Sequence, residues 1–134
     1  MKGDERLVER AGGRTFRITG GGFWQIHRKA ADILTTAVNE AIAKAGFDKT
    51  ADNLDLYGGV GLFAGTIAAK FGVDSVITTV EAFKTATEDA KLNLADLPNV
   101  RAILAPTERF LDERVSSHVK NGSPETTATV ILDP

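Results

Sequence analysis

The sequence predicts an α/β protein built on a parallel sheet, and three observations lead to this fold class. Short apolar, β-branched segments alternate with longer segments whose apolar residues recur every three to four positions, as expected of strands and amphipathic helices. The connections are short, which is typical of parallel strands joined by right-handed crossover helices. A composition of 43% hydrophobic and 25% charged residues in 134 positions suits one ordinary domain with a single core.

The first expected elements are a hairpin and a helix. Residues 6–18, RLVERAGGRTFRI, are interpreted as two short strands joined at the AGGR turn, where glycine accepts the turn geometry. The glycine-rich stretch TGGGFWQ is interpreted as a flexible joint. From Lys29 the apolar residues recur with helical spacing, and Gly46 suits the C-terminal end of that helix.

The rest of the chain is predicted to alternate between strand and helix. Apolar and β-branched runs predict strands at residues 53–57, 75–80, 100–104 and 127–132. Helical periodicity predicts helices at residues 62–71, 82–94 and 107 to about 120. Ligands of such sheets bind beyond the carboxyl ends of the strands, near the switch in strand order, so the site is expected there.

Composition excludes several classes of function. The chain has no cysteine, which excludes disulfides, cysteine metal sites and a thiol nucleophile in these residues, and no cluster has metal-ligand spacing. No apolar run approaches the roughly 20 residues that span a bilayer, and the first ten residues are too charged for a signal peptide. These features suit the cytoplasm and no membrane partner.

Basic residues gather at the start of the chain although the net charge is −2. Residues 1–30 hold seven Lys or Arg and three Asp or Glu. A basic segment can contact phosphates. The simpler interpretation is that these charges alternate along solvated strands.

The stretch NLDLYGGVGLFAG, residues 53–65, carries the strongest local signal. Gly59, Gly61 and Ala64 satisfy a loose dinucleotide fingerprint, and they also suit a tight turn that needs glycine only for backbone room. Asp55 would repel a pyrophosphate, whereas it suits a ligand with an ammonium and a sulfonium, such as S-adenosylmethionine. Glu81 ends the second strand of the sheet, where a carboxylate can accept both ribose hydroxyls, and Asp133 ends the fourth.

Five ordered motifs point to a family. They are FWQIH at 23–27, LDLYGGVGLFA at 54–64, TVE at 79–81, DAKLNL at 89–94 and VILDP at 130–134. Together they resemble the RNA uracil-5-methyltransferases, which methylate C5 of uridine in tRNA and rRNA. The resemblance implies a class I methyltransferase (Rossmann-like) parallel sheet, truncated after the fourth strand, with an N-terminal β-hairpin and helix. The first four strands would be ordered 3-2-1-4. The expected division is a hairpin and joint at 1–28 and an S-adenosylmethionine-binding portion at 29–134.

The resemblance also implies roles for individual residues. Gln25 would contact the cofactor, and Tyr57 with the turn from Gly59 to Gly61 would lie against its methionine part. Glu81 would hold the ribose hydroxyls, and Asp133 would begin a loop beside the cofactor. The sequence departs from the family pattern at His27, Gly58 and Leu62. The leucine at 62 stands where some members have a polar residue that touches the cofactor.

A further departure concerns the reaction. Members use a cysteine to attack C6 of the uracil, and a downstream glutamate to help remove the C5 proton. Both lie after the terminal DP motif, so we expect the chain to be the front half of a catalytic domain and to be inactive alone. The RNA partner, tRNA or rRNA, is then a partner of the full-length protein. Residues 127–134 would form an exposed edge strand through which the chain self-associates.

Two other classes of function stay open from the sequence. One is a nucleotide-binding oxidoreductase domain, and the other is a non-catalytic interaction module that keeps only the fold. The two histidines, His27 and His118, are interpreted as a packing residue and a surface residue. Phe23 and Trp24 could stack on a base, although packing against the first helix is the preferred interpretation.

Overall fold

The computed structural model describes residues 6–19, 28–121 and 127–132. Two strands, β1 (Arg6–Ala11) and β2 (Arg14–Thr19), form an antiparallel hairpin. The central sheet contains β3 (Asp52–Leu56), β4 (Ile77–Glu81), β5 (Val100–Leu104) and β6 (Thr127–Leu132). The helices are α1 (Arg28–Ala45), α2 (Leu62–Phe71), α3 (Lys84–Asn93) and α4 (Thr107–Asn121).

The central sheet is parallel and is ordered β5-β4-β3-β6. In order of appearance this is 3-2-1-4, so the predicted strand order is confirmed. The α/β class and the alternation of strands and helices are confirmed as well. The strand expected at 75–80 begins two residues later, because the Ser75 amide donates to the Gly72 carbonyl and closes a turn first.

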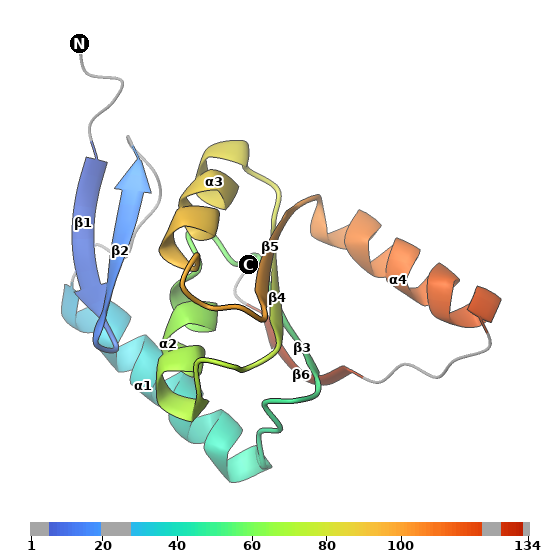
Figure 1. Ribbon diagram of the computed structural model, residues 1–134, viewed down its shortest axis with the longest axis horizontal. Helices are drawn as coiled ribbons and strands as arrows, with labels where there is room; N and C mark the ends of the chain where they lie inside the picture. The colour runs from blue at the N-terminus through green and yellow to red at the C-terminus, as the bar shows by residue number, and fades with distance from the viewer. Residues whose placement is uncertain (1–5, 20–27, 122–126, 133–134) are drawn as a thin grey trace.

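The sheet is covered on both faces (Figure 1). Helices α1, α2 and α3 lie on one side, and α4 lies on the other. The larger apolar cluster fills the side of α1 to α3, with Ile67, Ile77 and Leu94 among its buried members. Phe110 and Leu111 of α4 pack against Leu54, Leu56 and Val80 on the opposite face. Apolar side chains on both faces of the strands explain why they are near-continuous apolar runs in the sequence.

The hairpin packs on the outer side of the helices rather than on the sheet (Figure 1). Ala11 and Phe16 are buried against Ala31 of α1 and Leu62 of α2. Gly65 of α2 permits this contact, because a side-chain carbon there would come within 3.0 Å of the Phe16 ring. The expected division of the chain at residue 28 stays a prediction. None of the helices in the described ranges is both long enough and apolar enough to cross a membrane.

Candidate functional site

The glycine turn, residues 57–61, joins the carboxyl end of β3 to the N-terminus of α2. Its backbone runs through three left-handed positions, at Tyr57 (φ 59°), Gly59 (φ 57°) and Gly61 (φ 92°). Glycine adopts such angles without strain, whereas a non-glycine residue such as Tyr57 does so rarely. The Gly58 amide donates to the Val80 carbonyl at 2.9 Å, which ties the turn to the end of β4.

The three glycines of the turn are needed for different reasons. A side-chain carbon at Gly58 would overlap the hydroxyl of Thr79, and one at Gly61 would lie 2.8 Å from a methyl of Leu94. At Gly59 the same carbon would meet no atom of the described residues within 4 Å. Among these residues the backbone at Gly59 therefore faces open space, while Gly58 and Gly61 are packed against β4 and α3.

Glu81 brings the end of β4 to the glycine turn. One carboxylate oxygen accepts a hydrogen bond from the Gly59 amide at 2.9 Å, and the other accepts from the Phe83 amide at 2.9 Å. Phe83 immediately precedes the first residue of α3. The Glu81 side chain therefore bonds one backbone amide at the glycine turn and a second backbone amide at the start of a helix. An ionised carboxylate offers about four acceptor positions, and these two bonds leave the others for further donors.

Asp55 lies in the interior behind the glycine turn. It is the penultimate residue of β3 and its side chain is fully buried. It pairs in register with Thr79 of β4, so the two side chains lie next to each other on one face of the sheet. Its Oδ2 atom would be 3.2 Å from a side-chain carbon at Gly58, which places the carboxyl directly beneath the turn.

Tyr57 connects the turn to the far side of the sheet. Its hydroxyl donates to Oε1 of Glu108, in the first turn of α4, at 3.0 Å. This hydrogen bond to a carboxylate is the main cause that raises the pKa of Tyr57 above its ordinary value. The phenol therefore stays protonated at neutral pH, and Tyr57 as a whole is 38% exposed.

Sequence reasoning missed two residues that hold the hairpin against this site. Asp89 of α3 accepts from the Thr19 amide at 2.7 Å and from the Thr19 hydroxyl at 2.6 Å. Asn93, one turn later, binds the backbone of Arg17. Both polar side chains are buried, beside the apolar Ala90 and Leu94. Their spacing of four residues on a buried helix face, within the motif DAKLNL, was the available signal.

Of the seven predicted site residues, five lie in the described part of the chain: Asp55, Tyr57, Gly59, Gly61 and Glu81. The structure brings these five together around the turn between β3 and α2. Gln25 and Asp133 lie outside the described residues, as do His27, Phe23 and Trp24. His118 belongs to α4, and its side chain also lies outside the described part.

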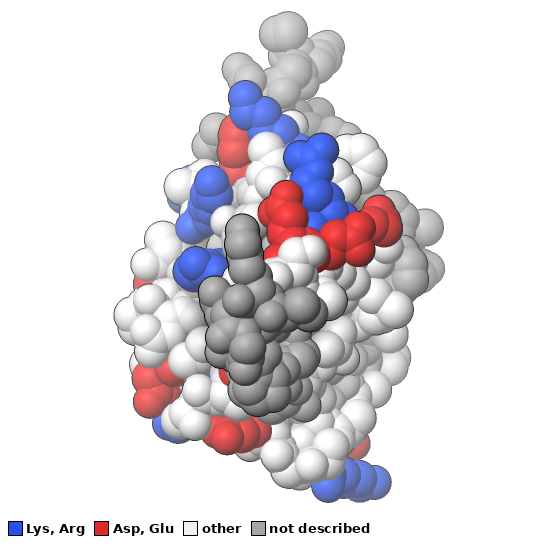
Figure 2. Space-filling model, turned by 90° about the vertical axis from the view of Figure 1, so that its right-hand side faces the viewer, with Lys and Arg blue, Asp and Glu red and all other residues white. Residues whose placement is uncertain are grey.

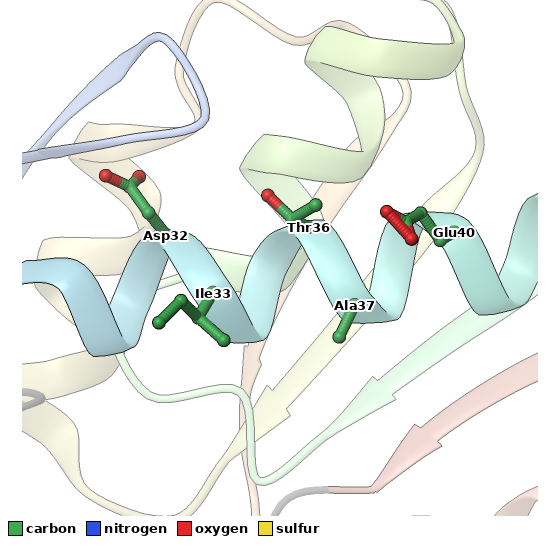
Figure 3. Close-up of a pocket in the computed structure, with 5 residues that line it drawn as sticks. All are labelled: Asp32, Ile33, Thr36, Ala37 and Glu40. Atoms are coloured by element: carbon green, nitrogen blue, oxygen red, sulfur yellow. The ribbon is translucent and has the colours of Figure 1, made fainter.

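A shallow hollow elsewhere on the surface is separate from this site. It is lined by Asp32, Ile33, Thr36, Ala37 and Glu40, all on the outer face of α1 (Figure 3). Among the residues that the structure describes, one exposed helix face provides all of the lining, and no second described element brings polar groups to this hollow, as an enclosed ligand site requires.

Sequence comparison relates the chain to RNA methyltransferases, although no family model matches it. An uncharacterized RNA methyltransferase of Streptomyces coelicolor is 48% identical over 103 residues, covering 77% of this chain and 22% of the relative. An uncharacterized RNA methyltransferase of Streptomyces avermitilis is 47% identical over 126 residues, covering 94% of this chain and 27% of the relative. A tRNA (uracil-5-)-methyltransferase homolog of Mus musculus is 32% identical over 123 residues, covering 88% of this chain and 19% of the relative. The chain thus spans about a quarter or less of these relatives.

Several solved structures with the same fold are methyltransferases. A T. thermophilus 16S rRNA methyltransferase in complex with AdoMet and guanosine matches with a TM-score of 0.66 at 20% identity, covering 97% of this chain and 33% of that chain. A SAM-dependent methyltransferase of Agrobacterium tumefaciens matches with a TM-score of 0.62 at 21% identity, covering 97% of this chain and 40% of that chain. The chain therefore has the class I methyltransferase fold and is homologous to RNA methyltransferases over the part of them that it spans.

Proposed function

We propose that this chain is the cofactor-binding portion of an S-adenosylmethionine-dependent RNA (uracil-C5) methyltransferase that acts on tRNA or rRNA. The single observation that carries the proposal is the position of Glu81 against the glycine turn. Its carboxylate lies at the carboxyl end of β4 and binds Gly59, whose backbone faces open space. An acceptor beside an open stretch of backbone suits an adenosyl ligand, whose ribose has two adjacent hydroxyls to donate.

The residues present fit this cofactor. Glu81 retains acceptor positions for ribose hydroxyls, and Gly59 allows the ligand to approach the main chain. Phe83, two residues after Glu81, is 74% exposed and offers an aromatic ring on the same edge of the sheet. When bound, S-adenosylmethionine supplies an activated methyl group. These residues would bind and orient it above the carboxyl of Asp55, which lies directly beneath the turn.

The same geometry weighs against a dinucleotide. A pyrophosphate needs free amides at the turn and at the start of the following helix. In this chain the Gly59 amide is already bonded to Glu81, so it is not free to donate to a phosphate. Calorimetric titration of the full chain with S-adenosylhomocysteine and with NAD separates the two functions. We expect binding of S-adenosylhomocysteine only. Binding of NAD alone would favour the oxidoreductase domain, and binding of neither would favour a non-catalytic module.

The hairpin offers a surface for the RNA substrate. Arg10 and Arg17 are exposed, and the pairing of Arg10 with Thr15 and of Val8 with Arg17 places both arginines on one face of the hairpin. None of these four residues is acidic. In contrast, acidic and basic side chains are interspersed on the face shown in Figure 2. A basic, acid-free strand face suits contact with a phosphate backbone.

The RNA contact is testable with charge reversals. Arg10→Glu and Arg17→Glu should weaken the binding of labelled tRNA and reduce its dependence on salt, because fewer counterions are released. Lys44 lies in the last turn of α1, at the opposite end of that helix from Ala31, which packs against the hairpin. Lys44→Glu is therefore the matched control. Equal RNA affinity for the hairpin variants and the control would contradict this surface. Because the sequence contains no cysteine, this chain alone should transfer no methyl group to uridine.

A further inference from the structure

Asn93, the last residue of α3, lies between the hairpin and the glycine turn. Its side-chain amide donates to the Val60 carbonyl at 3.0 Å and to the Arg17 carbonyl at 3.0 Å, and its oxygen accepts from the Arg17 amide at 2.8 Å. Both amide hydrogens are therefore used, and the side chain is only 7% exposed. A single buried side chain thus bonds two segments that are 43 residues apart in the sequence, at positions 17 and 60.

The hairpin depends on α3 for the partners of its outer edge. In β2, Arg17 and Thr19 direct their backbone groups away from β1 and toward α3. Asp89 takes the Thr19 amide, and Asn93 takes both backbone groups of Arg17. Unpaired backbone groups at a buried edge are costly, so these two side chains set where the hairpin docks.

The glycine turn depends on the same helix. Val60 stands between Gly59 and Gly61, which both have positive φ, and its side chain is buried. Its carbonyl has Asn93 as donor on one side of the turn, while Glu81 holds the Gly59 amide on the other. Leu94 packs directly against Gly61. Two side chains from β4 and α3 therefore clamp a turn in which glycine would otherwise allow many conformations.

We propose that Asn93 is a positioning residue that couples docking of the N-terminal hairpin to ligand binding at the glycine turn. When the hairpin leaves α3, Asn93 loses both bonds to Arg17 and its amide is free to rotate away from Val60. The turn then loses one of its two clamps and its binding conformation becomes less populated. Coupling of this kind is reciprocal, so a ligand on the turn also favours the docked hairpin. The ligand half of this inference rests on the proposed function of the turn.

A double-mutant cycle tests the coupling. Asp89→Ala loosens the hairpin without touching the turn, and Asn93→Ala removes the link. We expect each single variant to weaken binding of S-adenosylhomocysteine about three- to tenfold, the effect of losing one or two net hydrogen bonds. In the Asn93→Ala background, Asp89→Ala should have no further effect on affinity. Asn99→Ala loses one amide-to-carbonyl bond, to Asp74, and is the matched control.

Amide hydrogen exchange without ligand tests the link independently of the proposed function. Asp89→Ala should accelerate exchange of the Gly61 amide in the natural sequence and leave it unchanged in the Asn93→Ala background. If Asn93→Ala does not fold, Asn93→Asp replaces it, because the carboxylate keeps the size and the acceptor for Arg17 but loses both donors. Equal effects of Asp89→Ala in both backgrounds would overturn the coupling. Absence of ligand binding by the unmodified chain would overturn the proposed function, while the exchange result would still decide the coupling.

Discussion

Replacement of Glu81 by alanine is the sharpest test of the candidate site. The carboxylate binds the amides of Gly59 and Phe83 and has acceptor positions left for a ligand. Hydrogen bonds that involve a charged group contribute about 1.5–3 kcal/mol. We therefore expect Glu81→Ala to weaken binding of S-adenosylhomocysteine by about 1.5–3 kcal/mol, or roughly 10- to 150-fold in Kd.

The structural role of Glu81 has to be separated from its role toward the ligand. Loss of the two amide contacts should lower the free energy of unfolding by about 1–3 kcal/mol. Chemical denaturation measures this change, and calorimetry is then performed where both proteins are folded. Glu88→Ala removes the same charge from an exposed position of α3 and is the matched control. The ribose assignment is wrong if folded Glu81→Ala binds S-adenosylhomocysteine as tightly as the unmodified chain.

Three further predictions test the turn, the phenol and the sheet edge. Gly59→Val should abolish ligand binding in calorimetry, because the valine side chain would fill the open space at the turn. Gly46→Val imposes a similar backbone strain (φ 84°) away from the site, so that variant should still bind the ligand. The single tyrosine, Tyr57, should have a pKa above its ordinary value of about 10. Its hydrogen bond to Glu108 therefore stabilises the fold below a pH of about 10, and this stabilisation is lost as the pH rises through the folded-state pKa. Ultraviolet titration should show a lower pKa in Glu108→Gln, and an unchanged midpoint would contradict the hydrogen bond. At the sheet edge formed by β6, Val130 is 52% exposed, so light scattering should detect self-association that Val130→Lys reduces; a strictly monomeric chain at high concentration would refute this edge contact.

The sequence predicts most of the fold because its signals are local. Apolar periodicity separates strands from helices, and the alternation of the two imposes a parallel sheet. The glycines of the turn also act locally, since positive φ at Gly59 and Gly61 is a property of the backbone there. Glu81 follows from its place at the end of a strand, and its proximity to the turn follows from the pairing of β3 with β4.

The contacts that sequence reasoning missed are those between distant segments. Asn93 bonds Arg17 across 76 residues, and Tyr57 bonds Glu108 across 51 residues. Neither partner, Arg17 or Glu108, is marked by a pattern in the sequence, because one contact depends on how the hairpin packs on α3 and the other on how α4 packs on the opposite face of the sheet. A buried Asn on a helix is the weak signal that remains, since such a group requires partners that its own helix does not provide.

The arrangement around the glycine turn also explains why so flexible a sequence adopts one conformation. Glycine lowers the strain of a positive φ, but it raises the conformational entropy that folding must overcome. Here that cost is offset by contacts from outside the turn: Glu81 on one side, Asn93 on the other, and Leu94 against Gly61. A turn held in this way needs little rearrangement to accept a ligand, and less ordering on binding means higher affinity. The residues that build the fold between β4 and α3 are therefore also the residues that prepare the site.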